Sequence, residues 1–124
     1  MKQNLILYAE DDKFMAELNI SFLEEIGGYE VMWACDGEKA VEMYKERTPD
    51  LILLDIEMPK MDGLEVAEAV RMIDKVTPII FMSSHTDPKV IQKCFNLGAN
   101  EYINKIIDTN DMLATINRVL QKTE

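Results

Sequence analysis

Residues 51–63 constrain the fold of this chain more than any other segment. They begin with an unbroken run of four large apolar residues, Leu51 to Leu54, which is followed at once by Asp55. Because such a run cannot alternate between core and solvent, it indicates a strand buried on both faces, as in a parallel sheet. Ligands of open α/β sheets bind beyond the carboxyl ends of the strands, where Asp55 is expected. Taken alone, Asp55 could equally well cap a turn.

Strand-like and helix-like patterns alternate along the whole chain. Short strand-like runs lie at residues 5–9, 29–34, 51–54, 79–82 and 101–104. A segment with apolar residues at helical spacing follows each run. This alternation predicts a single α/β domain over residues 1–124, with a doubly wound five-stranded parallel sheet and helices on both faces. The run at 29–34 alternates most, so we expect it nearer the sheet edge.

The first predicted helix follows Asp12, which we expect to be its N-cap. Its large apolar residues recur every four positions and are Phe14, Leu18, Phe22 and Ile26. We expect this stripe to face the core, because a surface helix buries its apolar side.

Composition narrows the function. The formal net charge of −10 and a pI near 4.5 disfavour direct binding to nucleic acid or to anionic membranes, and favour metal cations or basic partner surfaces. No apolar stretch approaches the length of a membrane span or a signal peptide. Cys35 and Cys94 are far apart, lack CxxC spacing and each lie beside an apolar residue, so we expect buried free thiols and a cytoplasmic location.

Polar residues follow the predicted strands at one edge of the sheet. In chain order they are Glu10 and Asp11, then Asp36, Asp55, Ser83 and Lys105. Carboxylates brought together without a positive partner repel one another, so their convergence without a role would cost stability. Mg²⁺ takes oxygen ligands and keeps several waters, so two or three carboxylates make a suitable half-cage for it.

Four motifs appear in order along the chain. They are Glu10-Asp11; Asp55 within Leu-Leu-Asp-Ile-Glu-Met-Pro-Lys-Met-Asp-Gly; Ser83, five residues after Pro78; and Gly98-Ala99-x-x-Tyr102-x-x-Lys105. Together they resemble the receiver domain of two-component response regulators, the single-domain relatives of the chemotaxis regulator. The resemblance covers the whole chain and implies a flavodoxin-like sheet in the order 2-1-3-4-5.

This resemblance implies a phosphorylation site. Asp55 would accept a phosphoryl group from a partner histidine kinase or a histidine phosphotransfer protein. Glu10, Asp11, Asp55 and the backbone carbonyl of Glu57 would hold Mg²⁺, with Mn²⁺ as a substitute. Phosphoryl transfer has a loose transition state in which positioning and charge neutralisation supply most of the catalysis, which suits a carboxylate nucleophile beside a metal.

The resemblance also implies a switch. Ser83 and Lys105 would contact phosphoryl oxygens, and Ser83 with Tyr102 would couple the site to a surface made by the fourth helix, fifth strand and fifth helix. Glu57 and His85 would tune the lifetime of the phosphoryl group. The chain would thus catalyse no more than its own phosphorylation and dephosphorylation.

Two rival functions use the same residues. The chain could be a Mg²⁺-dependent aspartyl phosphatase with Asp55 as nucleophile and Glu57 as second acid, although 124 residues leave no cap domain. It could also be a pseudo-receiver that binds partners without phosphorylation.

The sequence leaves several matters open and departs from the family at two positions, of which one, Ser83 where threonine is also common, keeps the hydroxyl. The downstream target is a separate protein or a missing output domain, and dimerisation through the last helices is undecided. The cognate kinase is likewise not written in the residues. The family usually has a cis proline after the lysine, whereas Ile106 follows Lys105 here, and we expect a trans bond because a cis non-proline bond costs about 3 kcal/mol.

Overall fold

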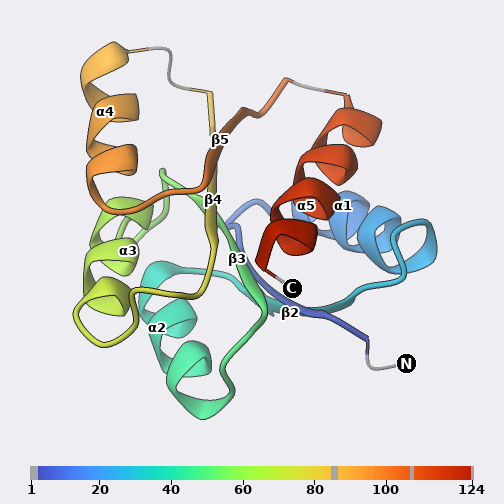
Figure 1. Cartoon of the computed structure of the whole chain (residues 1–124), viewed down its shortest axis with the longest axis horizontal. Coiled ribbons are helices and arrows are strands. Elements are labelled where there is room, and N and C mark those ends of the chain that lie inside the picture. The colour runs from blue at the N-terminus through green and yellow to red at the C-terminus, as the bar shows by residue number, and fades with distance from the viewer. Residues whose placement is uncertain (1–2, 85–86, 107, 124) are drawn as a thin grey trace.

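The computed structural model describes residues 3–84, 87–106 and 108–123, and shows a parallel sheet between two layers of helices (Figure 1). The strands are β1 (Leu5–Ala9), β2 (Glu30–Ala34), β3 (Leu51–Asp55), β4 (Ile79–Ser83) and β5 (Glu101–Asn104). The helices are α1 (Lys13–Glu25), α2 (Gly37–Glu46), α3 (Gly63–Arg71), α4 (Pro88–Asn96) and α5 (Thr109–Thr123). The predicted alternation of strands and helices is confirmed.

The strands pair in the order β2-β1-β3-β4-β5, and every neighbouring pair is parallel. This is the predicted order. Strand β2 pairs with one side of β1 and β3 pairs with the other, so the strand order reverses at β1. As a result β1 and β3 are neighbours, although β2 and two helices separate them in the sequence. Such a reversal opens a crevice at the carboxyl ends of the two strands, where α/β proteins bind their ligands.

The two faces of the sheet carry separate apolar clusters. On β1, Ile6 and Tyr8 belong to the cluster under α1 and α5, whereas Leu7 and Ala9 belong to the one under α2, α3 and α4. Successive side chains on a strand point to opposite faces, so a strand covered on both sides must be apolar throughout. The edge strand β2 is half-buried except at Ala34, as its alternating pattern predicts.

Helix α1 turns a different face to the sheet from the one we expect. Phe14, Leu18 and Ile26 are 72%, 54% and 67% exposed, and Phe22 is only partly buried. The buried positions are Ala16, Asn19 and Leu23. The prediction for this stripe is therefore wrong at three of its four positions. A four-residue repeat advances about 40° per step around a helix with 3.6 residues per turn, so it drifts away from a single face, whereas the buried positions follow the 3-4 spacing of one face.

The N-cap of α1, the two cysteines and the peptide bond after Lys105 were each predicted from the sequence. Asp12 caps α1 by accepting the backbone N–H of Met15, as expected. Cys94 is a buried free thiol, but Cys35 is exposed because it follows edge strand β2, so the expectation of burial is wrong there. The peptide bond after Lys105 is trans. Along residues 3–84, 87–106 and 108–123, no helix is both long and apolar enough to span a membrane.

Candidate functional site

The site lies where β1 and β3 end side by side. Ala9 pairs with Leu54, so Glu10 and Asp55, which follow them, are adjacent across the sheet. Both side chains are buried, at 0% and 1% exposure, whereas Asp11 is exposed. One carboxylate oxygen from each of the three acids lies within 4.8 Å of the others. The acidic pocket therefore forms at the sheet edge where the sequence predicts it.

The loop after β3 fixes the backbone around Asp55. The Asp62 side chain caps α3, and the N–H of Gly63 donates to the Ile56 carbonyl over 2.8 Å. A Cβ at Gly63 would lie 2.3 Å from the Asp55 carbonyl oxygen, so only glycine lets the helix start this close to the strand end. The turn also aims the Glu57 N–H at Asp55 Oδ1, at 3.2 Å.

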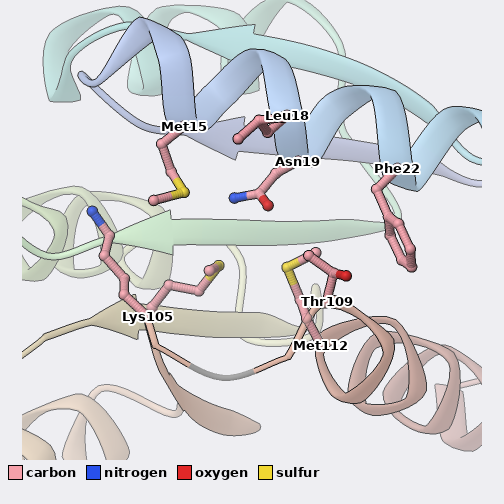
Figure 2. Close-up of a pocket in the computed structure, with 8 residues that line it drawn as sticks. Met15, Leu18, Asn19, Phe22, Lys105, Thr109 and Met112 are labelled. Carbon is pink, nitrogen blue, oxygen red and sulfur yellow. The ribbon is translucent and has the colours of Figure 1, made fainter.

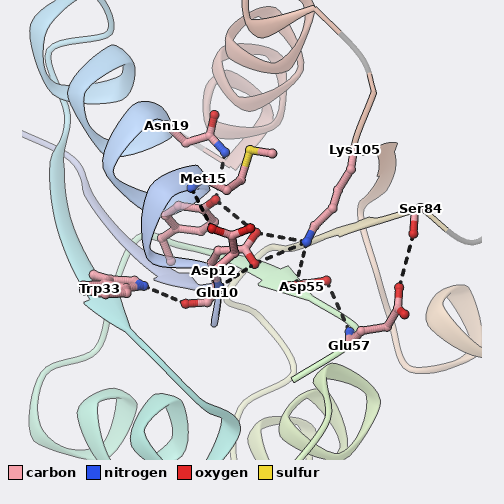
Figure 3. A network of polar contacts seen from close by, with 10 residues as sticks. Glu10, Asp12, Met15, Asn19, Trp33, Asp55, Glu57, Ser84 and Lys105 are labelled. Carbon is pink, nitrogen blue, oxygen red and sulfur yellow. Dashed lines mark hydrogen bonds and ion pairs between the residues drawn. The ribbon is translucent and has the colours of Figure 1, made fainter. Parts of the chain in front are cut away.

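A lysine from the far side of the sheet enters the pocket. Lys105 follows β5, and its Nζ lies 2.8 Å from Asp55 Oδ2 and 3.1 Å from Glu10 Oε1 (Figure 3). Its side chain is 21% exposed, while both acidic side chains are 1% exposed. One ammonium group therefore stands between two buried carboxylates and offsets part of their repulsion.

The charges in the pocket are not balanced by this lysine alone. Burial, followed by the charge of Asp55, raises the pKa of Glu10 to about 7, and Lys105 only partly opposes the shift. Burial by itself would lower the pKa of Lys105, but the hydrogen bonds and charges of Asp55 and Glu10 outweigh burial and raise it. The pocket therefore favours an additional positive charge.

The donor set fits a hard divalent cation. Glu10, Asp11 and Asp55 offer carboxylate oxygens only, which are the ligands that Mg²⁺ prefers. Two of these acids are buried and the third is exposed, so a bound ion would keep water on its open side, as Mg²⁺ does. The role expected for the Glu57 carbonyl stays a prediction.

Ser83 and Tyr102 lie next to this pocket and contact each other. On β4, Met82 pairs with Asp55, so Ser83 lies one residue beyond the level of Asp55, where it is fully buried. The Ser83 carbonyl accepts the N–H of Lys105 at 3.0 Å. Burial raises the pKa of Tyr102, and a side-chain hydrogen bond with Ser83 opposes that shift. The two residues predicted to form the switch are therefore linked.

The residues predicted to tune the phosphoryl lifetime lie on two loops. Glu57 is exposed, and its carboxylate accepts a hydrogen bond from Ser84 Oγ at 3.3 Å, which ties the β3–α3 loop to the end of β4. His85 lies outside the described residues. The roles of both stay predictions.

Sequence reasoning missed three polar side chains that support the pocket. Trp33 carries no motif, yet its indole Nε1 donates to the Glu10 carbonyl at 2.8 Å. Tyr8 and Asn19 form a buried hydrogen bond of 2.8 Å directly beneath Glu10. The role of Tyr8 could have been predicted from the sequence. Residues two apart on a strand face the same side of the sheet, so the Tyr8 hydroxyl lies on the same side as the Glu10 side chain.

Comparisons with known proteins agree with this geometry. The family model described as "Response regulator receiver domain" matches residues 6–117. The chemotaxis protein CheY of Bacillus subtilis is 34% identical over 115 residues, which cover 93% of this chain and 96% of that protein. A CheY-like receiver domain from Methanospirillum hungatei superposes with a TM-score of 0.93 at 25% identity, covering 98% of this chain and 97% of that one.

Some relatives are longer than this chain. The transcriptional regulatory protein CrdR of Helicobacter pylori is 35% identical over 117 residues, which make up 94% of this chain but 54% of CrdR. The chain thus spans about half the length of such regulators. The match over residues 6–117 agrees with the strand order and with the buried acids beside a lysine. The chain therefore belongs to the response regulator receiver domain family.

Proposed function

We propose that this chain is a cytoplasmic switch that takes a phosphoryl group from a partner histidine kinase or histidine phosphotransfer protein onto Asp55. The observation that carries the proposal is the cluster around this carboxylate. Asp55 is buried at the carboxyl edge of the sheet, within 4.8 Å of two further acids and 2.8 Å from the Lys105 ammonium. Membership of a signalling family supports a switch over an enzyme that turns over substrate.

The acids would bind the cation that the reaction needs. Glu10, Asp11 and Asp55 would hold Mg²⁺ (or Mn²⁺), together with the Glu57 carbonyl. When bound, the ion supplies positive charge to the phosphoryl oxygens. In the transfer, a bond forms between an Asp55 oxygen and phosphorus. The bond from phosphorus to the donor's histidine nitrogen breaks, and that nitrogen keeps the electron pair.

Lys105 and Ser83 would stabilise the transferred group. The Lys105 ammonium already contacts Asp55, and a small movement of its flexible stem would bring it onto a phosphoryl oxygen as a point charge. The Ser83 hydroxyl can rotate to donate to another oxygen.

The same hydroxyl would start the signal. Ser83 is hydrogen-bonded to Tyr102 in this structure, so a phosphoryl group that recruits Ser83 would release the tyrosine. Tyr102 packs on the cluster beneath α2, α3 and α4, and it lies on β5 between α4 and α5 in the sequence. Its movement would therefore change the α4–β5–α5 surface, which would be read by a separate protein or by an output domain.

Intact mass after incubation with a small-molecule phosphodonor tests the acceptor. The wild type should gain one phosphoryl group only with Mg²⁺, and Asp55→Asn should gain none. Asp12→Asn is the matched control, because asparagine also caps a helix and the acid lies at the same sheet edge. We expect this variant to behave as the wild type does.

The same experiment separates the rival functions. No gain in mass under any condition would favour the pseudo-receiver. Sustained release of phosphate from a small phosphate ester, lost in Asp55→Asn, would favour the phosphatase. Mass gain in Asp55→Asn equal to that of the wild type would place the acceptor elsewhere.

A further inference from the structure

We propose that Tyr8 and Asn19 are positioning residues that hold the Glu10 carboxylate ready for Mg²⁺. The inference rests on the proposed function, because it assumes that Glu10 is a metal ligand. It goes beyond that function because neither residue belongs to the four motifs by which the chain resembles its family.

A chain of hydrogen bonds leads from helix α1 to the acidic pocket. Asn19 Nδ2 donates to the Tyr8 hydroxyl over 2.8 Å, and that hydroxyl donates to Glu10 Oε1 over 3.5 Å. Figure 3 shows Asn19 extending from α1 toward the pocket that contains Glu10. Asn19 and Lys105 also line a cavity between α1 and α5 (Figure 2). Tyr8 and Glu10 are 0% exposed and Asn19 is 4% exposed, so the chain lies within the protein.

The asparagine determines where the phenol proton points. A tyrosine hydroxyl has one proton to donate and lone pairs that accept. Since the Asn19 amide donates to the Tyr8 oxygen, the Tyr8 proton is left for an acceptor, and the Glu10 carboxylate is within reach. Asn19 therefore acts on Glu10 through Tyr8, without touching the carboxylate itself.

Glu10 is held at both of its oxygens. Oε1 accepts from Tyr8, and Oε2 accepts the backbone N–H of Asp12 at 3.3 Å. These two bonds fix the plane of the carboxylate before any ion arrives. Partners of this kind orient metal ligands, and their loss typically weakens metal binding by about 10- to 100-fold.

The surroundings argue against packing as the whole explanation. Tyr8 belongs to the cluster under α1 and α5, whose other buried members are mostly aliphatic side chains such as Leu53 and Ile80, and Asn19 is a buried polar residue. Phenylalanine and leucine at positions 8 and 19 would fill a similar volume without burying polar groups, which is costly unless they are hydrogen-bonded. The Tyr8–Asn19 pair instead lies where the Tyr8 hydroxyl reaches the Glu10 carboxylate.

The protein contains a matched control. Tyr29 also belongs to the cluster under α1 and α5, and its hydroxyl bonds to the side chain of Asn117. Neither residue belongs to the acid cluster formed by Glu10, Asp11 and Asp55. Tyr29→Phe therefore removes the same kind of tyrosine–asparagine bond without removing a contact to Glu10.

The test is a Mg²⁺ titration followed by the fluorescence of Trp33, which is the sole tryptophan and donates to the Glu10 carbonyl. Thermal stabilisation by Mg²⁺ gives a second readout. We expect the Mg²⁺ Kd to rise about tenfold in Tyr8→Phe and by a smaller factor in Asn19→Leu. The double variant should match Tyr8→Phe, because Asn19 acts through the hydroxyl. Tyr29→Phe should keep the wild-type Kd.

Phosphorylation separates positioning from damage to the fold. At saturating Mg²⁺, Tyr8→Phe should reach nearly the wild-type rate, and only the Mg²⁺ concentration for half-maximal rate should rise. A Kd within twofold of the wild type in Tyr8→Phe, whatever its melting temperature, would overturn the inference and leave the proposed function standing. A wild-type chain that binds no Mg²⁺ by either readout would overturn both.

Discussion

Two polar clusters, each centred on carboxylate groups or a single carboxylate, lie at opposite ends of the sheet. At the carboxyl end, Glu10 and Asp55 lie side by side and share one lysine. Between them they also accept hydrogen bonds from Tyr8 and from the backbone N–H groups of Asp12 and Glu57. Toward the amino end, Asp74 lies in the segment that leads from α3 to β4. Its carboxylate accepts the Tyr44 and Thr77 hydroxyls, both at 2.5 Å, and the backbone N–H groups of Val76 and Thr77.

The two clusters shift pKa values in opposite directions. Burial acts to raise the pKa of Asp74, but the hydrogen bonds from Thr77, Tyr44 and the backbone hold it well below its usual range. Burial and a like charge raise the pKa of Glu10 to about 7. Hydrogen bonds to a charged carboxylate stabilise its ionised form, whereas burial beside a second acid destabilises it and leaves the pair suited to a cation.

The largest effect should come from removing the Asp74 carboxylate. Asp74→Ala leaves two hydroxyls and two N–H groups without their charged acceptor, and should lower the free energy of unfolding by about 3 kcal/mol. Urea unfolding measures this loss. Phosphorylation of the folded fraction should persist. A loss below about 1 kcal/mol would show that water replaces the carboxylate at little cost.

The acidic pocket should make stability depend on pH. Because the pKa of Glu10 rises from 4.5 to about 7 on folding, the native state holds a proton that the unfolded chain has already released. The stabilisation that comes from this bound proton is complete below pH 4.5, the pKa of Glu10 in the unfolded chain. It is lost as the pH rises through about 7, the pKa of Glu10 in the native state. Without Mg²⁺, stability should therefore fall by about 2 kcal/mol between about pH 5 and about pH 8.

Glu10→Gln is the control for this pH dependence. The variant has no proton to release at position 10, so chemical unfolding across the same pH range should show a much flatter profile. An equal fall in stability in the wild type and in Glu10→Gln would assign the effect to another group.

Mg²⁺ should distinguish the two clusters directly. At ten times its Kd, the ion should raise the unfolding free energy of the wild type by about 1.4 kcal/mol, as expected for one site on the native state. Asp55→Asn loses a ligand and should show a much smaller rise, whereas Asp74→Asn should show the full one. Thermal unfolding with and without the ion measures both, and equal stabilisation of all three proteins would contradict a site at Asp55.

The smallest change in stability is expected at the exposed acid of the pocket. Asp11→Asn should alter the unfolding free energy by less than about 0.5 kcal/mol, as is usual for exposed positions. It should nevertheless reduce the stabilisation by Mg²⁺, since the side chain is one of three clustered acids. Full Mg²⁺ stabilisation in this variant would remove Asp11 from the ligand set.

The sequence predicted the sheet and the acids well, and the helix surface less well. Leu51 to Leu54 are apolar without a break, and this local pattern is enough to identify a central strand ending at Asp55. For α1 the pattern was ambiguous, because large apolar residues lie on more than one side of the helix. Periodicity shows that a helix has apolar positions, but it does not show which of them the sheet will cover.

The partners of the acids were also beyond the sequence. Lys105 lies 95 residues from Glu10 and 50 from Asp55, and the motif predicted its presence at the site but not that it bridges both carboxylates. The Asn19–Tyr8 bond joins two residues that carry no motif, and the contact to the Glu10 carbonyl comes from Trp33, which carries none either. Such contacts depend on distances through space, which spacing along the chain does not encode.

The sequence by itself determined the order of strands and helices and the collection of acids at one sheet edge. Both follow from local properties, since apolar runs form strands and parallel strands end on the same side. Only the tertiary structure decided which face of α1 is buried and how Glu10 is held between Tyr8 and Lys105. Those outcomes required segments distant in sequence to pack together, because the pKa and orientation of a buried carboxylate depend on every group that surrounds it.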